Sequence, residues 1–189
     1  MTWFQKALRR FSIKDLILIA AMAALGMAVK AIINPLIRLA SAALFIPGGA
    51  LAGGLYMMWL VMAVGLTGKR GAATLAGLVQ AIIVILTGIG GSHGLFSLVS
   101  YTLPGIIIDI WLLISRHKVC CLFCTFISCI LANLIGVTSV NLIFFRLPEI
   151  PLLLSLAAAA LSGGVGGVIT WHLLQALQKY GVIAGNKSP

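Results

Sequence analysis

Long apolar runs follow one another along almost the whole chain, and short stretches that are charged or rich in glycine and proline separate them. The runs cover about residues 16–37, 44–66, 71–90, 95–115, 119–143 and 151–177. Each is close in length to the ~20 apolar residues that a helix needs to cross a hydrocarbon core of ~30 Å. The pattern predicts an all-α integral membrane protein, built as a bundle of six transmembrane helices.

The two ends of the chain depart from this pattern. Residues 1–15 combine basic and aromatic side chains, which favours an amphipathic segment at the membrane interface. The first apolar run lacks the small-residue cleavage site of a secretory signal, so we interpret it as a span. We expect an interfacial N-terminal segment (1–15), a transmembrane domain (16–177) and a tail (178–189). Three connections rich in Gly and Pro are expected to form caps without helix: about 34–49, 88–94 and 144–151.

Composition excludes a water-soluble protein. Charged residues make up 8% of the sequence and hydrophobic residues 61%, whereas a soluble domain carries roughly 25% charged residues. Six spans with short loops use up the 189 residues. We therefore expect no nucleotide-hydrolysing domain in this sequence.

The distribution of basic residues predicts the orientation, because Lys and Arg of short loops stay on the cytoplasmic side. Most of them lie before the first span, in the second and fourth connections or after the last span: Lys6, Arg9, Arg10, Lys14, Lys69, Arg70, Arg116, Lys118, Lys179 and Lys187. Arg38 and Arg146 lie in connections on the opposite side. Both termini are therefore predicted to be cytoplasmic, in a multi-pass protein of a bacterial cell membrane. The net charge of +10 then reflects topology, and no nucleic-acid partner is expected, because the basic residues are scattered.

Two charged residues lie inside the predicted spans. Lys30 lies in the outer half of the first span, and we expect its long stem to snorkel outward to the interface. Asp109 lies about six residues from the cytoplasmic end of the fourth span, where a buried carboxylate needs a partner or a proton. Two interpretations of Asp109 stay open, namely pairing with a basic residue and proton or substrate chemistry.

Small residues recur at four-residue spacing on three of the spans, which lets another helix approach closely. The stripes are Ala20, Ala24 and Ala28 on the first span, Gly49 and Gly53 on the second, and Ala159, Gly163 and Gly167 on the sixth. We interpret the second and third stripes as packing within the bundle. The alanine stripe has two explanations at this stage, internal packing or a contact with a partner subunit.

Neutral polar side chains within the spans are the best pointers to a binding site, because such groups usually face a cavity or a neighbouring helix. The candidates are Gln80, Asn133 and Asn141 within spans, Ser97 and Tyr101 on the outer half of the fourth span, and His93 in the glycine-rich loop before it. We predict that they line one outward-facing pocket, with His93 as a lid or ligand contact. The alternative for the amide side chains is hydrogen bonding between helices.

Motifs for catalysis and for metal binding are weak or absent. The sequence has no paired carboxylates, no phosphate-binding loop and no Ser/His/Asp set at a shared depth, so neither enzymatic activity nor a cofactor is expected. His117, Cys120, Cys121 and Cys124 share one helical face and are soft-metal ligands. No second ligand pair follows them and the cysteines lie among large apolar residues, so no metal site is predicted.

A group of motifs between residues 47 and 118 resembles a known transporter family. The motifs are Tyr56-x-x-Trp59, the turn Lys69-Arg70-Gly71-Ala72-Ala73, the loop that ends at Gly94, and Gly105-x-x-x-Asp109 followed by Arg116-His117-Lys118. Together they resemble the substrate-binding subunits, or S components, of energy-coupling factor (ECF) transporters, the vitamin-uptake branch of ABC transporters. The resemblance is to the hydroxymethylpyrimidine/thiamine-type group, some of whose relatives have been labelled cobalt-transport permeases.

The resemblance implies a bundle that holds one vitamin-like molecule near its outer face and leaves ATP hydrolysis to other subunits. Family members dock through an Ala-x-x-x-Ala stripe on the first helix to a transmembrane T component, which is coupled to two cytoplasmic ATPases. Ala20, Ala24 and Ala28 match this stripe. Ligand contacts are expected in the outer loops, including Asn34, and from Tyr56 and Trp59, whose rings suit stacking on an aromatic ligand. Core packing is the alternative for these two rings.

One departure from the family pattern bears on the ligand. Where thiamine-type members carry carboxylates on the second and third helices, this chain has Gly53 and Gly77. A cationic ligand would have no counter-ion there, and an uncompensated buried charge costs several kcal/mol. We therefore expect a neutral or anionic vitamin or vitamin precursor, such as a thiamine-related pyrimidine. The alternative function is a self-sufficient small secondary transporter or a cobalt-type metal permease.

Overall fold

The computed structural model is an all-helical bundle, and it describes residues 11–44, 48–88, 94–115, 119 and 121–180. Within these residues the elements, in chain order, are α2 (Ile13–Leu44), α3 (Gly48–Thr67), α4 (Ala72–Thr87), the 3-10 turn η1 (Gly94–Phe96), α5 (Ser97–Ile114), α6 (Leu122–Val140), the π-helix η2 (Asn141–Phe145) and α7 (Glu149–Lys179). The six α-helices correspond to the six predicted apolar runs. The predicted fold class is confirmed.

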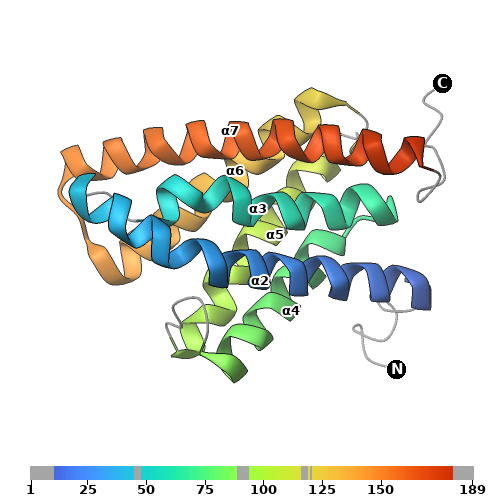
Figure 1. The fold of residues 1–189 in the computed structure, drawn as a ribbon, viewed down its shortest axis with the longest axis horizontal. Helices are drawn as coiled ribbons and strands as arrows, with labels where there is room; N and C mark the ends of the chain where they lie inside the picture. The colour runs from blue at the N-terminus through green and yellow to red at the C-terminus, as the bar shows by residue number, and fades with distance from the viewer. Residues whose placement is uncertain (1–10, 45–47, 89–93, 116–118, 120, 181–189) are drawn as a thin grey trace.

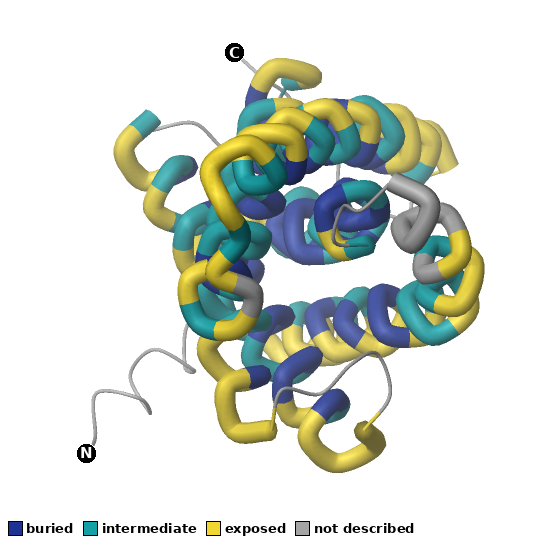
Figure 2. The backbone as a smooth tube through the Cα atoms, turned by 90° about the vertical axis from the view of Figure 1, so that its left-hand side faces the viewer, coloured by how far each residue is buried: buried dark blue, intermediate teal, exposed yellow. Residues whose placement is uncertain are grey.

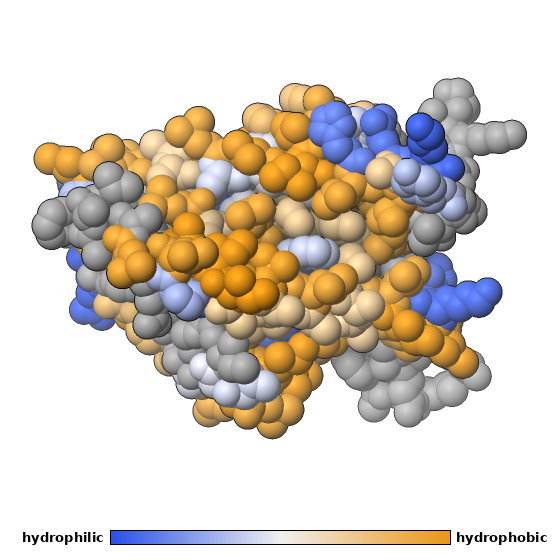
Figure 3. Space-filling model, in the orientation of Figure 1, coloured by the Kyte–Doolittle hydropathy of each residue, from blue (hydrophilic) through white to orange (hydrophobic). Residues whose placement is uncertain are grey.

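The lengths of the helices are those of a multi-pass membrane protein. Five of the helices in the described residues are long and apolar enough to cross a bilayer. The exception is α4, whose 16 residues span about 24 Å at 1.5 Å per residue. Apolar side chains cover the middle of the molecule in Figure 3, and the hydrophilic surface gathers where α7 ends.

The first helix is longer than predicted. We expected residues 34–49 to form a cap without helix, but α2 runs through Asn34 and Pro35 to Leu44. A proline removes one backbone hydrogen bond, and transmembrane helices tolerate this when neighbouring groups satisfy the freed carbonyl. The expectation of a cap at 144–151 is also wrong in part, because α7 already begins at Glu149. Pro151 lies in its first turn, where proline is tolerated.

α3 is the central helix of the bundle, packed against α2, α4, α6 and α7. It lies between α2 and α7 in Figure 1, and the inward-facing turns in Figure 2 are the buried ones. At Gly54 and Gly166 its contact with α7 is made by backbone atoms. A Cβ added to Gly54 would lie 1.7 Å from the carbonyl oxygen of Ser162, and one added to Gly166 would lie 2.3 Å from that of Gly54.

Glycines of the predicted stripes also pack inside the bundle, as expected. A Cβ on Gly163 would lie 2.9 Å from the Cα of Ile130, and one on Gly167 would lie 2.5 Å from the Cα of Phe126. Both contacts join α7 to α6. Gly49 differs, because no atom lies within 4 Å of the position its Cβ would take.

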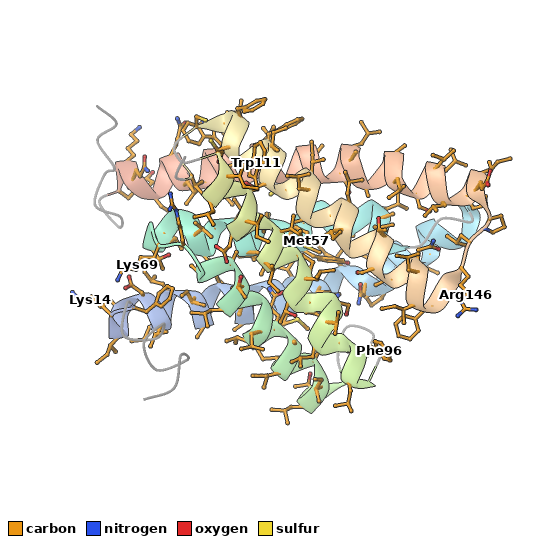
Figure 4. All side chains as sticks on the ribbon, turned by 180° about the vertical axis from the view of Figure 1, so that it is seen from behind. Lys14, Met57, Lys69, Phe96, Trp111 and Arg146 are labelled. Carbon is orange, nitrogen blue, oxygen red and sulfur yellow. The ribbon has the colours of Figure 1, made fainter. Side chains whose placement is uncertain are left out.

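Residues that the sequence predicts on the same side of the membrane lie at the same end of the bundle. α2 begins and α7 ends at the same end of the molecule (Figure 1). Lys14 and Lys69 lie at that end and Arg146 lies at the other (Figure 4). The Nζ of Lys69 is 2.6 Å from Oδ2 of Asp15, which ties the start of α2 to the connection between α3 and α4.

Candidate functional site

A cavity of about 280 Å³ lies within the half of the bundle away from Ile13 and Lys179, among α2, α3, α4, α5 and α6. Its size is near the lower end of small-molecule pockets, which begin at about 300 Å³. Most of its wall is apolar, and Met57, labelled near the middle of Figure 4, is part of it. The polar side chains in the wall are Lys30, Asn34, Tyr56, Gln80, Ser100, Tyr101, Asn133 and Asn141.

Lys30 points into this cavity, so the expectation that it snorkels outward is wrong. Its ammonium donates a hydrogen bond to the hydroxyl of Tyr101. The Nζ also lies 4.1 Å from the ring centroid of Tyr101 and 5.2 Å from that of Tyr56. Helical spacing explains the direction, because Gly26, Lys30 and Asn34 follow one another at four-residue intervals and share a face. Gly26 is buried on that face, so Lys30 faces the bundle.

Tyr56 and Asn34 close one side of the cavity by joining α3 to α2. The hydroxyl of Tyr56 donates to Oδ1 of Asn34 over 2.9 Å. Tyr56 is 8% exposed, so this bond is made away from bulk solvent. Asn34 was expected in a loop, but it reaches the cavity from inside α2.

Asn133 joins three helices at the cavity wall. Its Nδ2 donates to the carbonyl of Ala159 and to the hydroxyl of Ser162, both over 2.8 Å. That hydroxyl donates in turn to the carbonyl of Ala50 over 2.7 Å. A Cβ on Gly53 would lie 1.8 Å from Oδ1 of Asn133, so the glycine makes room for the amide. Asn133 therefore both links α3, α6 and α7 and lines the cavity.

The two other amide side chains are held in different ways. The Oδ1 of Asn141 accepts a bond from the backbone N–H of Leu147 over 3.0 Å, which closes the turn after the π-helix. Gln80 is 6% exposed, and a Cβ on Gly26 would lie 2.5 Å from its Nε2. Both side chains line the cavity. The alternative of hydrogen bonding between helices does not by itself explain that position.

The remaining predicted contacts lie elsewhere. Trp59 packs beside Gly26, with its Cβ and Cδ1 each 3.2 Å from the position of an added Cβ, and it is not part of the cavity wall. Ser97 is fully buried at the start of α5 and is also outside the wall. His93 lies outside the described residues. Ser100, which lines the cavity next to Tyr101, was missed, because a serine inside an apolar span carries no distinct sequence signal.

Asp109 holds the first turn of α4 and is not part of the cavity. Its Oδ1 accepts from the N–H of Gly71 over 2.8 Å, and its Oδ2 accepts from the N–H and hydroxyl of Thr74 over 2.9 and 2.6 Å. Gly71 has φ 92°, a conformation that favours glycine. The start of a helix attracts negative charge. The partner found for Asp109 is thus a helix start, whereas the first of the two interpretations named a basic side chain.

The described residues contain no group of three or more His, Cys, Asp or Glu side chains placed to hold a metal ion. Of the four residues on the predicted soft-ligand face, His117 and Cys120 lie outside the described residues. The sulfur atoms of Cys121 and Cys124 are 3.1 Å apart.

The alanine stripe lies on the outside of the bundle. Ala20, Ala24 and Ala28 are exposed along α2. Large apolar side chains flank them, including Ile17 at 62% and Leu25 at 45% exposure. The stripe is therefore available to lipid or to another protein, and it takes no part in the packing of this bundle.

Comparison with known proteins supports a role in membrane transport. A family model described as "ABC-type cobalt transport system, permease component" matches residues 14–135. The fold is similar to that in a "Crystal structure of an S-component of ECF transporter", with a TM-score of 0.78 and 16% identity. That similarity covers 91% of this chain and 88% of the other. No curated protein matches the sequence significantly.

Proposed function

The chain belongs to the family of ABC-type cobalt transport system permease components, and from this premise we propose that it is the substrate-binding S component of an ECF-type transporter. In this proposal it captures a small vitamin or vitamin precursor, such as a thiamine-related pyrimidine, at the outer face of a bacterial cell membrane. A transmembrane T component and two cytoplasmic ATPases then drive uptake. Residues 1–15 lie at the inner interface, residues 16–177 form the binding domain and both termini are cytoplasmic.

The observation that carries the proposal is a cavity confined to one half of the bundle. Toward the start of α2 the interior is filled by side chains that are almost fully buried, among them Ile19, Val64, Ile108 and Leu112. Close packing of this kind leaves no room for a ligand. In the proposal this packed half separates a molecule bound beside Lys30 from the other side of the membrane, and the T component and ATPases drive the movement that releases it.

The exposed alanine stripe supports a docking surface for that partner. Small side chains at four-residue spacing let a second helix approach closely in a membrane. Most small residues of the other stripes pack against helices of the same chain. The stripe on α2 is matched to the family's docking pattern and is left exposed.

The word cobalt in the family description favours a second function, a cobalt-type metal permease. Cobalt sites use nitrogen, sulfur or carboxylate ligands, and the cavity wall in the described residues has no His, Cys, Asp or Glu. The cavity therefore favours an organic ligand over a bare metal ion.

The test is a bulky substitution on the stripe. Ala24→Trp should abolish uptake into cells that also express the T component and ATPases, while the purified variant still binds the small molecule that co-purifies with the wild type. Ala157→Trp, at an exposed position on α7, is the matched control and should leave uptake unchanged. Normal uptake by Ala24→Trp would contradict the docking role, and failure to co-purify with the other subunits would contradict the ECF assignment.

A further inference from the structure

One positive charge faces the cavity without a counter-ion. Lys30 is the charged residue of the cavity wall in the described part of the chain. Its ammonium is held by the hydroxyl of Tyr101 and by the ring faces of Tyr101 and Tyr56. A phenol oxygen and a ring face offer partial negative charge, so they orient the ammonium without neutralising it.

The protein itself has no acid to offer to Lys30. The whole sequence contains three acidic residues, and all of them are described. Asp15 pairs with Lys69, Asp109 accepts hydrogen bonds from the first turn of α4, and Glu149 is exposed at the start of α7. None of the three forms an ion pair with Lys30.

A buried charge is tolerated when it is paired and hydrogen-bonded, and a charge inside a membrane protein marks a substrate site. We infer that the ligand supplies the missing partner: it is a small organic monoanion whose carboxylate pairs with Lys30. This assignment rests on the proposed binding function and narrows its ligand to a molecule that carries a carboxylate, so a pyrimidine without an acid group would not fit. One ammonium matches one negative charge, which favours a carboxylate over a doubly charged phosphate ester.

The rest of the wall fits the remainder of such a molecule. Met27, Met57 and Val137 give apolar surface for a ring or short chain, and the amides of Gln80 and Asn133 give hydrogen-bonding groups. Lys30 would repel a divalent cation, and the described part of the wall has no anionic side chain to bind one. The same site therefore selects for organic anions and against metal ions.

Thermal unfolding of the purified full chain in detergent tests the inference with matched probes. The probes are benzoate, nicotinate and indole-3-acetate, each compared with its neutral carboxamide, together with phenyl phosphate and CoCl₂. At least one carboxylate should raise the unfolding temperature in a saturable manner, while its carboxamide, phenyl phosphate and CoCl₂ should not. Stabilisation by none of the three carboxylates, or equal stabilisation by acid and amide, would overturn the inference.

Substitutions of Lys30 then show whether its charge is responsible. Lys30→Met should weaken binding of the stabilising carboxylate about 10- to 100-fold, the loss expected for one charge-assisted hydrogen bond. Lys30→Arg keeps the charge and should retain most of the affinity, and it serves as the readout if Lys30→Met does not fold. Lys14→Met, at an exposed lysine of α2, is the control. Unchanged carboxylate binding by Lys30→Met, or loss of binding by Lys14→Met, would refute the role of Lys30.

The outcomes separate this inference from the proposed function. Suppose that a carboxamide binds in place of the acids, and that Asn133→Ala weakens that binding. The cavity is then a ligand site, and only the assignment to anions fails. If a carboxylate binds through Lys30 but Ala24→Trp leaves uptake intact, the anion site stands and the docking role fails.

Discussion

Replacing Asp109 by asparagine tests whether this carboxylate serves structure or transport chemistry. The change keeps the shape of the side chain, but only one of its two outer atoms can still accept hydrogen bonds. If the amide oxygen keeps the two bonds from Thr74, the N–H of Gly71 at 2.8 Å faces an NH₂ group in place of an acceptor. We therefore expect a loss of stability that originates at the first turn of α4.

The magnitude follows from the contacts. A hydrogen bond to a charged group contributes ~1.5–3 kcal/mol, and a negative charge at a helix start contributes ~0.3–1 kcal/mol more. Asparagine is easier to bury than a carboxylate, which offsets part of the loss. The net cost is about 2–3 kcal/mol, which corresponds to a fall of roughly 4–12 °C in the unfolding temperature for a chain of this size.

The assay is thermal unfolding of the purified variants in one detergent, followed by circular dichroism, with uptake measured in parallel. Thr74→Val removes the hydroxyl bond of 2.6 Å and should cost about 1 kcal/mol. Glu149→Gln, at an exposed acid, should change stability by less than ~0.5 kcal/mol. The reasoning is refuted if Asp109→Asn is as stable as Glu149→Gln, and normal stability with abolished uptake would instead favour proton or substrate chemistry.

Gly53 and Gly49 both line the cavity, but their neighbours differ, so alanine is expected to have different effects at the two positions. Gly53→Ala should lower stability by ~1–3 kcal/mol through overpacking and weaken ligand binding, because its Cβ would lie 1.8 Å from Oδ1 of Asn133. Gly49→Ala has no atom within 4 Å of its Cβ and should leave stability unchanged. Thermal unfolding and ligand titration of both proteins check this, and equal behaviour would contradict the packing argument. Asn133→Ala removes two hydrogen bonds to α7 and should cost ~1–3 kcal/mol together with affinity for the co-purifying molecule. Unchanged unfolding and affinity would show that the amide does not support the wall.

The fold was predictable because a bilayer leaves few alternatives to apolar helices. Backbone groups must be satisfied within each span, so the length and spacing of apolar runs fixed the number of helices. Helix ends were harder to predict. Pro35 indicated the end of the first helix, but α2 continues to Leu44, because the effect of a proline in a membrane depends on neighbouring helices that the sequence does not display.

The candidate site was partly predictable for a similar reason. Polar residues in apolar spans pointed to Gln80 and Asn133, and both reach the cavity. Lys30 was misjudged because snorkelling and inward burial differ only in which helix face the residue occupies. The four-residue series Gly26, Lys30 and Asn34 could have shown that face. Trp59 lies one turn from Tyr56 but packs on α2, a distinction that depends on side-chain direction.

The backbone contact between α3 and α7 has a consequence for how ligand specificity can diversify. At Gly54 and Gly166 the two helices meet without side chains, and any larger residue would collide with a carbonyl group. Substitutions at Gly54 and Gly166 are therefore not expected to be tolerated. On α2 and α5, by contrast, Lys30 and Ser100 reach the cavity as side chains that can be exchanged without moving a helix. An evolving or redesigned member of this fold would keep Gly54 and Gly166 unchanged and acquire new ligands through substitutions on α2 and α5.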